Sequence, residues 1–356
     1  MLKVCFLCSN YEIGGLEKMI YNLSRRLDPT RFDISICLLR DRGKFATMMS
    51  SAAPGRLKIC SSLFAALHYI RENDFSVIHS FGLKSDLLSR LPMFRTGSPT
   101  IFSCVANPDL AHSVSRRIWN LISARSVDSF WADCRYRADQ GIRWGGIPSK
   151  KIEVIYPGID MDEFSPAEAS IVDHPFPIIG CVGNVRFIKG HQVVLEAIPA
   201  IVSKFPEALF YFVGSDFTGG KMASIATKLG VTRHVRFIGF QEDVRHYMRM
   251  FQLLLHPSFS EGLPRAILEA MSLEKPVIAS TVGGIPEIIT SGENGILVPP
   301  GDPALLAEKT LDLLRDPQLM DHVRKQARMT IRTKFRMDQM ISGFQQMYSR
   351  VIEKSK

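Results

Sequence analysis

The chain has 356 residues, which is enough for two domains that each bury a core. Its composition, 46% hydrophobic and 22% charged, is that of a globular protein, and it contains no apolar run of about 18 residues that would span a membrane. Residues 1–150 carry 21 Lys and Arg against 12 Asp and Glu, a net charge of +9, whereas the remaining 23 of each sign cancel. The basic half predicts an anionic partner, namely a membrane, a phosphorylated acceptor or a nucleic acid, and a merely solvated basic surface is the alternative.

The seven cysteines are an odd number, and most of them lie in apolar runs. This pattern predicts buried, reduced thiols in a cytosolic protein rather than a disulfide framework. Cys5 and Cys8 have the spacing of a metal or redox pair, but residues three apart on a strand point to opposite faces. We therefore expect neither a metal site nor a redox pair there.

Short β-rich apolar runs alternate with longer helical patterns, which predicts an α/β fold with parallel sheets. The expected strands are 3–8, 33–39, 57–60, 76–79, 100–104, 129–132 and 151–155, then 178–182, 208–213, 235–238, 253–256, 276–279 and 295–298. Gly and Pro punctuate the segment between the two sets, so that it reads as a linker. The prediction is two doubly wound, Rossmann-like domains facing each other across a cleft. They comprise residues 1–165 and 166–335, with a C-terminal helix over 336–356 that packs back on the first domain.

Two glycines, Gly14 and Gly15, follow the first expected strand and open directly into a helical pattern. Ligands of doubly wound sheets bind beyond the carboxyl ends of the strands, where glycine lets main-chain amides approach a phosphate. The pattern is not the GxGxxG of dinucleotide oxidoreductases, and a simple tight turn is the alternative.

The segment 116–125 is a basic helical pattern that contains Trp119 and several aliphatic side chains. Two interpretations stay open: the helix lies on an anionic bilayer, or it is an ordinary domain helix with Ile118, Leu121 and Ile122 in the core. Together with the basic first half, the former predicts peripheral contact with the inner face of a membrane. A lipid-linked acceptor would explain such contact.

In the second half, Arg186 and Lys189 follow the first expected strand and place two cations beside a helix start. Such cations suit a diphosphate on which negative charge develops. Taken singly, each is also compatible with an ordinary surface cation.

The two carboxylates Glu261 and Glu269 are the most informative pair in the sequence. Pro264 suits the first position of a helix, because its missing N–H would lie unbonded there. Glu261 then lies in the preceding loop, and Glu269 lies roughly 7–8 Å along the axis from Pro264, at about 1.5 Å per residue. The free amides of Gly262 and Leu263 add an anion site. An extended ligand with a phosphate in its middle and hydroxyls at both ends fits this layout, and a nucleotide sugar is such a ligand.

These residues resemble the retaining GT-B glycosyltransferases of family four over essentially the whole chain. The resemblance rests on short motifs: Gly14-Gly15-x-Glu17, Pro157-Gly158-Ile159-Asp160, Lys189-Gly190, the Glu261 and Glu269 pair, Val282-Gly283-Gly284-Ile285-Pro286-Glu287, and Asn294-Gly295.

The resemblance implies a role for each charged residue of the second half. Arg186 and Lys189 are expected to hold the donor diphosphate and to stabilise it as it leaves. Glu261 is expected to contact sugar hydroxyls, and Glu269 to accept from the ribose hydroxyls. Asn184 occupies the place where many members carry an arginine, for which Arg186 is the substitute.

The resemblance also implies main-chain contacts to the donor. The amides of Gly262 and Leu263, just before Pro264, are expected near the sugar, and the main chain near Phe240 near the base. Gly15, with Gly14 before it, is expected to bring its amide near the diphosphate when the cleft closes.

The acceptor side departs from the family pattern. Many members show two histidines around 77–82, and only His79 is present here. Asn107 lies in a segment where a further histidine often follows the next strand. In a front-face retaining mechanism the leaving phosphate can itself take the acceptor proton, so a missing histidine need not abolish activity.

Asp160-Met161-Asp162 resembles the metal-holding DxD of the other major glycosyltransferase fold, but it lies in the linker. We therefore expect no metal cofactor. The predicted function is a cytosolic, metal-independent retaining glycosyltransferase that uses a UDP- or GDP-linked sugar and a glycan or lipid-linked acceptor.

Two alternatives remain, a sugar-nucleotide epimerase of related fold and a non-catalytic basic binding protein. Nucleic acid is not expected as a partner, because the aromatic residues are not interleaved with the basic ones. A glycoside hydrolase is disfavoured because its two carboxylates flank one bond, whereas Glu261 and Glu269 are expected at opposite ends of the donor.

Overall fold

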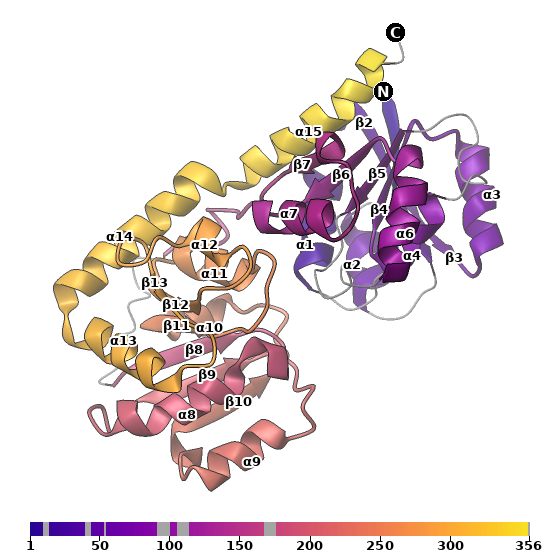
Figure 1. The fold of residues 1–356 in the computed structure, drawn as a ribbon. Helices are drawn as coiled ribbons and strands as arrows, with labels where there is room; N and C mark the ends of the chain where they lie inside the picture. Colours follow the sequence, from indigo (N-terminus) through magenta and orange to yellow (C-terminus); the bar gives the residue numbers. More distant parts are fainter. Residues whose placement is uncertain are drawn as a thin grey trace. The chain divides into compact units, whose positions relative to one another are not determined.

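The structure is a computed structural model that describes residues 1–9, 14–39, 44–52, 55–90, 100–104, 114–166 and 176–354. The chain forms two compact units (Figure 1). One comprises Met1–Pro157 with Asp338–Lys356, and the other comprises Gly158–Met337. Each unit is built on a parallel sheet, so the predicted α/β fold with two Rossmann-like halves is confirmed.

The second unit begins at Gly158, ahead of the boundary that the sequence placed after residue 165. Ile159 forms an isolated parallel bridge with Arg336. In this bridge Ile159 N donates to Phe335 O at 2.8 Å, and Met337 N donates to Ile159 O at 3.0 Å. These bonds attach the start of the linker to the second unit.

The first unit contains a seven-stranded parallel sheet in the order β3-β2-β1-β4-β5-β6-β7. Its strands are β1 (Leu2–Cys8), β2 (Phe32–Leu39), β3 (Leu57–Cys60), β4 (Val77–Phe81), β5 (Thr100–Cys104), β6 (Ser129–Ala132) and β7 (Ile152–Val154). The order changes direction between β1 and β4, which makes the sheet doubly wound. Each strand predicted for this half has a counterpart here.

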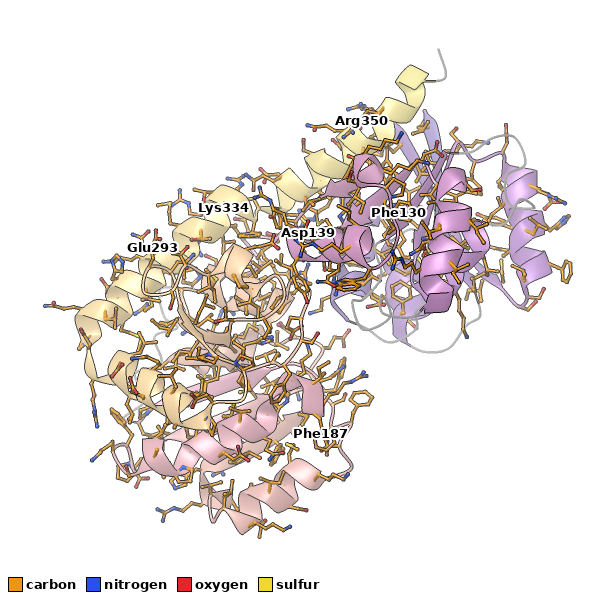
Figure 2. All side chains as sticks on the ribbon, in the orientation of Figure 1. Phe130, Asp139, Phe187, Glu293, Lys334 and Arg350 are labelled. Atoms are coloured by element: carbon orange, nitrogen blue, oxygen red, sulfur yellow. The ribbon has the colours of Figure 1, made fainter. Side chains whose placement is uncertain are left out.

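The first unit also contains helices from both ends of the chain. They are α1 (Gly15–Arg26), α2 (Lys44–Ala52), α3 (Leu63–Asn73), α4 (Leu83–Ser89), α6 (Val114–Ser123), α7 (Arg135–Arg143) and α15 (Met337–Lys354). The inner face of α15 buries Phe344 and Tyr348. Arg350 of α15, labelled in Figure 2, donates to Glu153 Oε2 on β7 at 2.7 Å. Helix α15 thus packs on the unit that contains β1.

Helix α6 exposes three aliphatic side chains. Ile118, Leu121 and Ile122 are 51%, 57% and 69% exposed. Asn120 is buried, and its Nδ2 donates to Gly145 O, just beyond α7, at 2.8 Å. The interpretation that placed the three aliphatic residues in the core is therefore wrong, because the helix buries a polar face instead.

A buried ion pair explains how a polar face can pack. Arg90, at the end of α4, is paired with Asp86 at 2.6 Å. The same guanidinium donates to Asn120 Oδ1 at 2.5 Å and to Ser123 Oγ at 3.4 Å on α6. Because a buried charge is tolerated only when it is paired and hydrogen-bonded, this network determines which face of α6 points inward.

The second unit contains a six-stranded parallel sheet in the order β10-β9-β8-β11-β12-β13. Its strands are β8 (Ile178–Val182), β9 (Leu209–Val213), β10 (Val235–Gly239), β11 (Leu253–His256), β12 (Val277–Ser280) and β13 (Ile296–Val298). The order changes direction between β8 and β11. Gly180 lies on central strand β8, where a Cβ would come 2.0 Å from the Phe251 ring, so the core admits only glycine at this point.

The helices of the second unit are α8 (His191–Val202), α9 (Lys221–Lys228), α10 (Arg245–Met250), α11 (Arg265–Ser272), α12 (Ile285–Ile288), α13 (Pro303–Arg315) and α14 (Pro317–Lys334). The buried residues of α8 and α13 join those of the central strands in one hydrophobic core. No helix in the described parts of the chain is long and apolar enough to cross a bilayer.

The cysteines whose side chains the structure describes are buried and free, as the sequence predicts. They are Cys5, Cys8, Cys37, Cys60, Cys134 and Cys181. Burial raises the pKa of the Cys5 and Cys181 thiols, so these side chains behave as small apolar groups of the core.

Candidate functional site

The loops that follow β8, β11 and β12 meet at one edge of the second sheet. Strand β11 pairs with both β8 and β12, so their carboxyl ends lie side by side where the strand order changes direction. Main-chain hydrogen bonds join the loops: Phe259 N donates to Ile188 O at 2.8 Å, and Gly284 N donates to Gly262 O at 2.9 Å. The place where α/β sheets bind ligands is therefore formed by these three loops.

Two glycines allow the loops to approach closely. Gly190 has a φ of +69°, and a Cβ there would lie 1.9 Å from Pro257 O. Gly283 has a φ of +59°, and a Cβ there would lie 2.1 Å from Glu261 O. Both positions combine a left-handed backbone with a close main-chain contact, so only glycine fits either of them.

Glu261 is the centre of a hydrogen-bonded cluster. Its Oε1 accepts from Lys189 Nζ at 2.6 Å, from His256 Nε2 at 2.7 Å and from Ser258 Oγ at 2.7 Å. Lys189 comes from the loop after β8, His256 is the last residue of β11, and Ser258 follows it. The structure thus brings together Lys189 and Glu261, which lie 72 positions apart in the sequence.

The Glu261 carboxylate stays ionised although it is buried. Burial by itself raises its pKa, but the hydrogen bond and charge of His256, followed by those of Lys189, outweigh burial and hold the pKa of Glu261 well below its ordinary value. An ionised carboxylate only accepts, so His256 donates from Nε2. Oε2 of Glu261 accepts no hydrogen bond from the described residues, which leaves it the capacity to accept from a ligand hydroxyl.

Glu269 lies on α11, one turn after Arg265. The helix begins at Arg265, one residue later than predicted, because Pro264 has an extended ψ of 115° and serves as the N-cap. Glu269 is buried, and its Oε1 lies 3.5 Å from Arg265 Nε. Among the described residues, neither Nε nor Nη1 of the buried Arg265 guanidinium has a hydrogen-bond partner. Buried donors without a hydrogen bond are costly, so this helix start is suited to an oxygen-rich ligand.

The second predicted cation, Arg186, is exposed and stacks on an aromatic ring. Its guanidinium carbon lies 4.3 Å from the Phe217 ring centroid. Phe187, labelled in Figure 2, is also exposed, and Lys221 Nζ lies 5.4 Å from its ring centroid. Arg186 and Phe187 belong to the same loop as Lys189, whereas Phe217 and Lys221 come from the segment after β9 and the start of α9. Together they form an accessible surface of cations and aromatic faces.

The other donor-side residues predicted in the second half lie at the same sheet edge. Asn184 follows β8 and is half-buried, and Phe240 directly follows β10 and is exposed. Strand β9 separates β10 from β8, so these two residues lie two strands apart. Gly262 and Leu263 are buried just before Pro264. Their contacts with a donor stay predictions.

Sequence reasoning missed His256, Ser258 and His191. The available signal for His256 was a polar residue at the carboxyl end of an apolar strand, because that is where such sheets bind ligands. His191 begins α8 and is buried, and burial lowers its pKa to about 4. His191 is therefore neutral near pH 7.

In the first unit, Gly14 is the N-cap of α1 and Gly15 is its first residue. Glu17 is buried and folds back over this helix start, since a Cβ at Gly14 would lie 3.0 Å from Glu17 Oε2. The two glycines therefore form a turn into a helix, as predicted, and their contact with a diphosphate stays a prediction.

His79 is completely buried on β4. Its Nδ1 lies 2.6 Å from Tyr348 Oη of α15, and the rings of Phe81 and Trp131 pack around it. Burial lowers its pKa to about 3, so the imidazole is neutral. This geometry indicates a structural part in joining β4 to α15 and does not support the predicted acceptor-side contact. Asn107 lies outside the described residues.

Of the two linker aspartates, Asp160 stabilises the turn that contains them. Asp160 Oδ1 accepts from the main-chain N of Asp162 at 3.0 Å and of Glu163 at 3.2 Å. Within the described ranges, no group of three His, Cys, Asp or Glu side chains could hold a metal ion.

Two protein-family models match the chain. The model described as "Glycosyltransferase Family 4" matches residues 13–163, and the one described as "Glycosyl transferases group 1" matches residues 176–316. The first match falls largely in the first unit, and the second falls entirely in the unit that contains the Glu261 cluster.

Curated relatives align over most or part of the chain. The D-inositol 3-phosphate glycosyltransferase of Streptomyces avermitilis is 24% identical, over 86% of this chain and 77% of that protein. The N-acetyl-alpha-D-glucosaminyl L-malate synthase of Bacillus anthracis is 28% identical, over 59% of this chain and 56% of that protein.

Solved structures share the fold over nearly the full length. Anabaena HepE, in complex with UDP, has a TM-score of 0.87 at 20% identity, covering 98% of this chain and 100% of that chain. Sucrose-phosphate synthase from Thermosynechococcus elongatus has a TM-score of 0.83 at 18% identity, covering 99% and 100%. The chain belongs to the group 1, family 4 glycosyltransferases, enzymes of the GT-B fold that transfer a sugar from a nucleotide-sugar donor.

Proposed function

We propose that this glycosyltransferase moves a sugar, with retention of configuration, from a UDP- or GDP-linked donor to a glycan or lipid-linked acceptor. The observation that carries the proposal is the contact of Lys189 with Glu261 at the sheet edge that α11 and Glu269 adjoin. A cation, two carboxylates and a helix start suit a diphosphate flanked by two groups rich in hydroxyls. HepE, which is similar in fold, is known in complex with UDP and with UDP-glucose, so UDP-linked sugars are the first donors to test.

We assign the charged residues to different parts of the donor. Lys189 and Arg186 bind the diphosphate, Oε2 of Glu261 accepts from hydroxyls of the sugar, and Glu269 accepts from the ribose. Negative charge on the diphosphate grows as the glycosidic bond breaks. Fixed cations therefore stabilise the departing group more than the bound donor, which is the condition for raising kcat.

The uncharged groups complete this assignment. The amides of Gly262 and Leu263 face the diphosphate and sugar, and the main chain after β10, near Phe240, receives the base. Because main chain rather than side chains receives it, the choice between UDP and GDP requires an experiment.

Retention needs no separate protein base in a front-face reaction. The acceptor attacks on the face from which the diphosphate departs, and an oxygen of the leaving phosphate takes the acceptor proton. The buried, neutral state of His79 is consistent with this route, since His79 is then not needed for proton transfer.

A thermal-shift panel tests the donor class. We expect UDP or GDP, and the matching sugar nucleotide, to raise the Tm of the protein, because binding to the folded state stabilises it. ADP serves as the comparison nucleotide. Slow hydrolysis of the best donor should then release free sugar and nucleoside diphosphate. Conversion of the donor into its epimer would indicate an epimerase instead, and no shift with any nucleotide would contradict the proposal.

We also propose that the reaction needs no divalent metal, since Lys189 and Arg186 supply positive charge at the diphosphate. Activity should be unchanged after EDTA treatment and dialysis and should not rise when Mg²⁺ or Mn²⁺ is restored. The measurement is the initial rate of nucleoside diphosphate release with donor and acceptor present. Loss of activity with EDTA that Mn²⁺ restores would contradict metal independence.

We further propose that the first unit contacts the inner, cytoplasmic face of an anionic membrane, where a lipid-linked acceptor is held. Exposed apolar side chains along α6 and at the C-terminal end of α7 support this proposal: Ile118, Leu121, Ile122, Ile142 and Trp144. Arg117 and Arg143 are exposed beside them, and residues 1–150 carry the net charge of +9. An apolar face flanked by arginines is what an interfacial helix presents to anionic lipid.

Liposome flotation tests this contact. The protein should float with vesicles of phosphatidylcholine and phosphatidylglycerol, float less at high salt, and remain in solution with phosphatidylcholine alone. The double variant Ile118→Ser/Ile122→Ser should lose flotation. Leu229→Ser, which replaces an exposed leucine of the second unit, is the matched control and should float like wild type. Equal flotation of all three proteins would contradict the assignment to α6.

A further inference from the structure

The three side chains that donate hydrogen bonds to Glu261 Oε1 differ in how firmly they are held. His256 ends strand β11, which is hydrogen-bonded to strands on both sides. The His256 side chain is buried, with only 6% of it exposed. Ser258 is fully buried. Lys189 is 28% exposed at its side chain and ends a short 3-10 turn in the loop after β8. His256 and Ser258 are therefore fixed, whereas Lys189 has room to move.

The proposed function requires two things of this cluster. Lys189 must reach the donor diphosphate, which draws its ammonium away from Glu261. Glu261 must at the same time keep its orientation, because a sugar hydroxyl is bound well only by an acceptor that is already in place. A hydrogen-bond donor that holds Oε1 independently of Lys189 meets both requirements.

Resting on that proposed function, we propose that His256 is a positioning residue for Glu261. Its Nε2–H holds Oε1 at 2.7 Å, leaving Oε2 for the hydroxyls of the transferred sugar, and it keeps the carboxylate in place when Lys189 turns to the diphosphate. Ser258 assists from the same side. His256 itself contacts neither the donor nor the acceptor and acts through Glu261.

The test distinguishes binding of the sugar from binding of the nucleotide. Dissociation constants for UDP and for UDP-glucose, or for the GDP pair where that binds more tightly, are measured by calorimetry for wild type, His256→Leu and His256→Gln. A glutamine amide nitrogen reaches about as far as histidine Nε2 and can still donate to Glu261. Steady-state kcat and KM are measured on the same proteins.

We expect His256→Leu to keep its affinity for UDP but to lose about 10- to 100-fold in affinity for UDP-glucose and in kcat, as substitutions that misorient a functional side chain commonly do. His256→Gln should restore most of both. His234→Leu is the matched control: His234 is also buried in the second unit, but its Nδ1 pairs with Ala208 O and not with Glu261. This variant should lower the Tm without changing the ratio of the two dissociation constants.

Two outcomes would overturn the inference. If His256→Leu binds UDP-glucose and turns over like wild type, Glu261 does not depend on His256. If affinity for UDP and UDP-glucose falls by the same factor, His256 is merely structural. Should His256→Leu not fold, His256→Asn replaces it, because asparagine is polar but too short to reach Glu261. Wild-type protein that binds none of these nucleotides would instead contradict the proposed function itself.

Discussion

Lys189→Ala should lower kcat about 100- to 1,000-fold, the usual loss when one preorganised group that stabilises developing negative charge is removed. The ammonium is the group closest to Glu261 and is expected to stabilise the departing diphosphate. Lys189→Arg keeps the charge but changes its geometry, so it should retain part of the activity. Initial rates at saturating donor measure this effect.

Matched controls make this prediction specific. Lys221→Ala removes another cation of the second unit, one that lies over the Phe187 ring, and should leave kcat close to wild type. His79→Ala should cost less rate than Lys189→Ala if the leaving phosphate takes the acceptor proton. The same is expected of His112→Ala, at another histidine of the first half that lies outside the described residues. Equal losses from either histidine variant and from Lys189→Ala would contradict that route.

Gly190→Ala should destabilise the second unit by about 2–5 kcal/mol, the sum of the left-handed backbone penalty and an overpacked contact. The new Cβ would lie 1.9 Å from Pro257 O, so the loops that hold Lys189 and Glu261 must separate. Nucleotide binding should therefore be lost together with stability. All three tryptophans lie in the first unit, so urea unfolding is followed by far-UV circular dichroism to measure the first effect. Calorimetry with UDP measures the second.

Gly230→Ala is the control for the backbone term. Gly230 has the same φ of +69°, but nothing lies within 4 Å of a Cβ there. This variant should lose only about 1–2 kcal/mol and should bind nucleotide like wild type. Equal destabilisation by the two substitutions would show that the contact with Pro257 O contributes nothing to the loss of stability in Gly190→Ala.

Much of the fold could be predicted because hydrophobic periodicity is a local property. The alternation of apolar runs and helical patterns correctly predicted two parallel sheets, and the run 253–256 coincides with β11. Lys189 and Glu261 were also identified, Lys189 because it follows a strand and Glu261 because it precedes a helix start marked by Pro264.

The rest depends on contacts between distant residues. Periodicity identified an apolar face on α6 but could not show whether that face points into the core. The buried Arg90 network directs the polar face of the helix inward instead. The unit boundary depends on the bridge between Ile159 and Arg336, which no local pattern reveals. His256 was missed because its partner lies across a loop, where neither helical nor strand spacing applies.

The two units differ in how they are distributed along the sequence. Gly158–Met337 is one uninterrupted stretch that contains the whole Glu261 cluster, so a single fragment can be expressed to supply it. The other unit is split between the two termini. A truncation that removes α15 would strip Phe344 from Trp131 and Tyr348 from His79, damaging the half that was synthesised first. The first unit therefore completes its folding only after α15 has been synthesised.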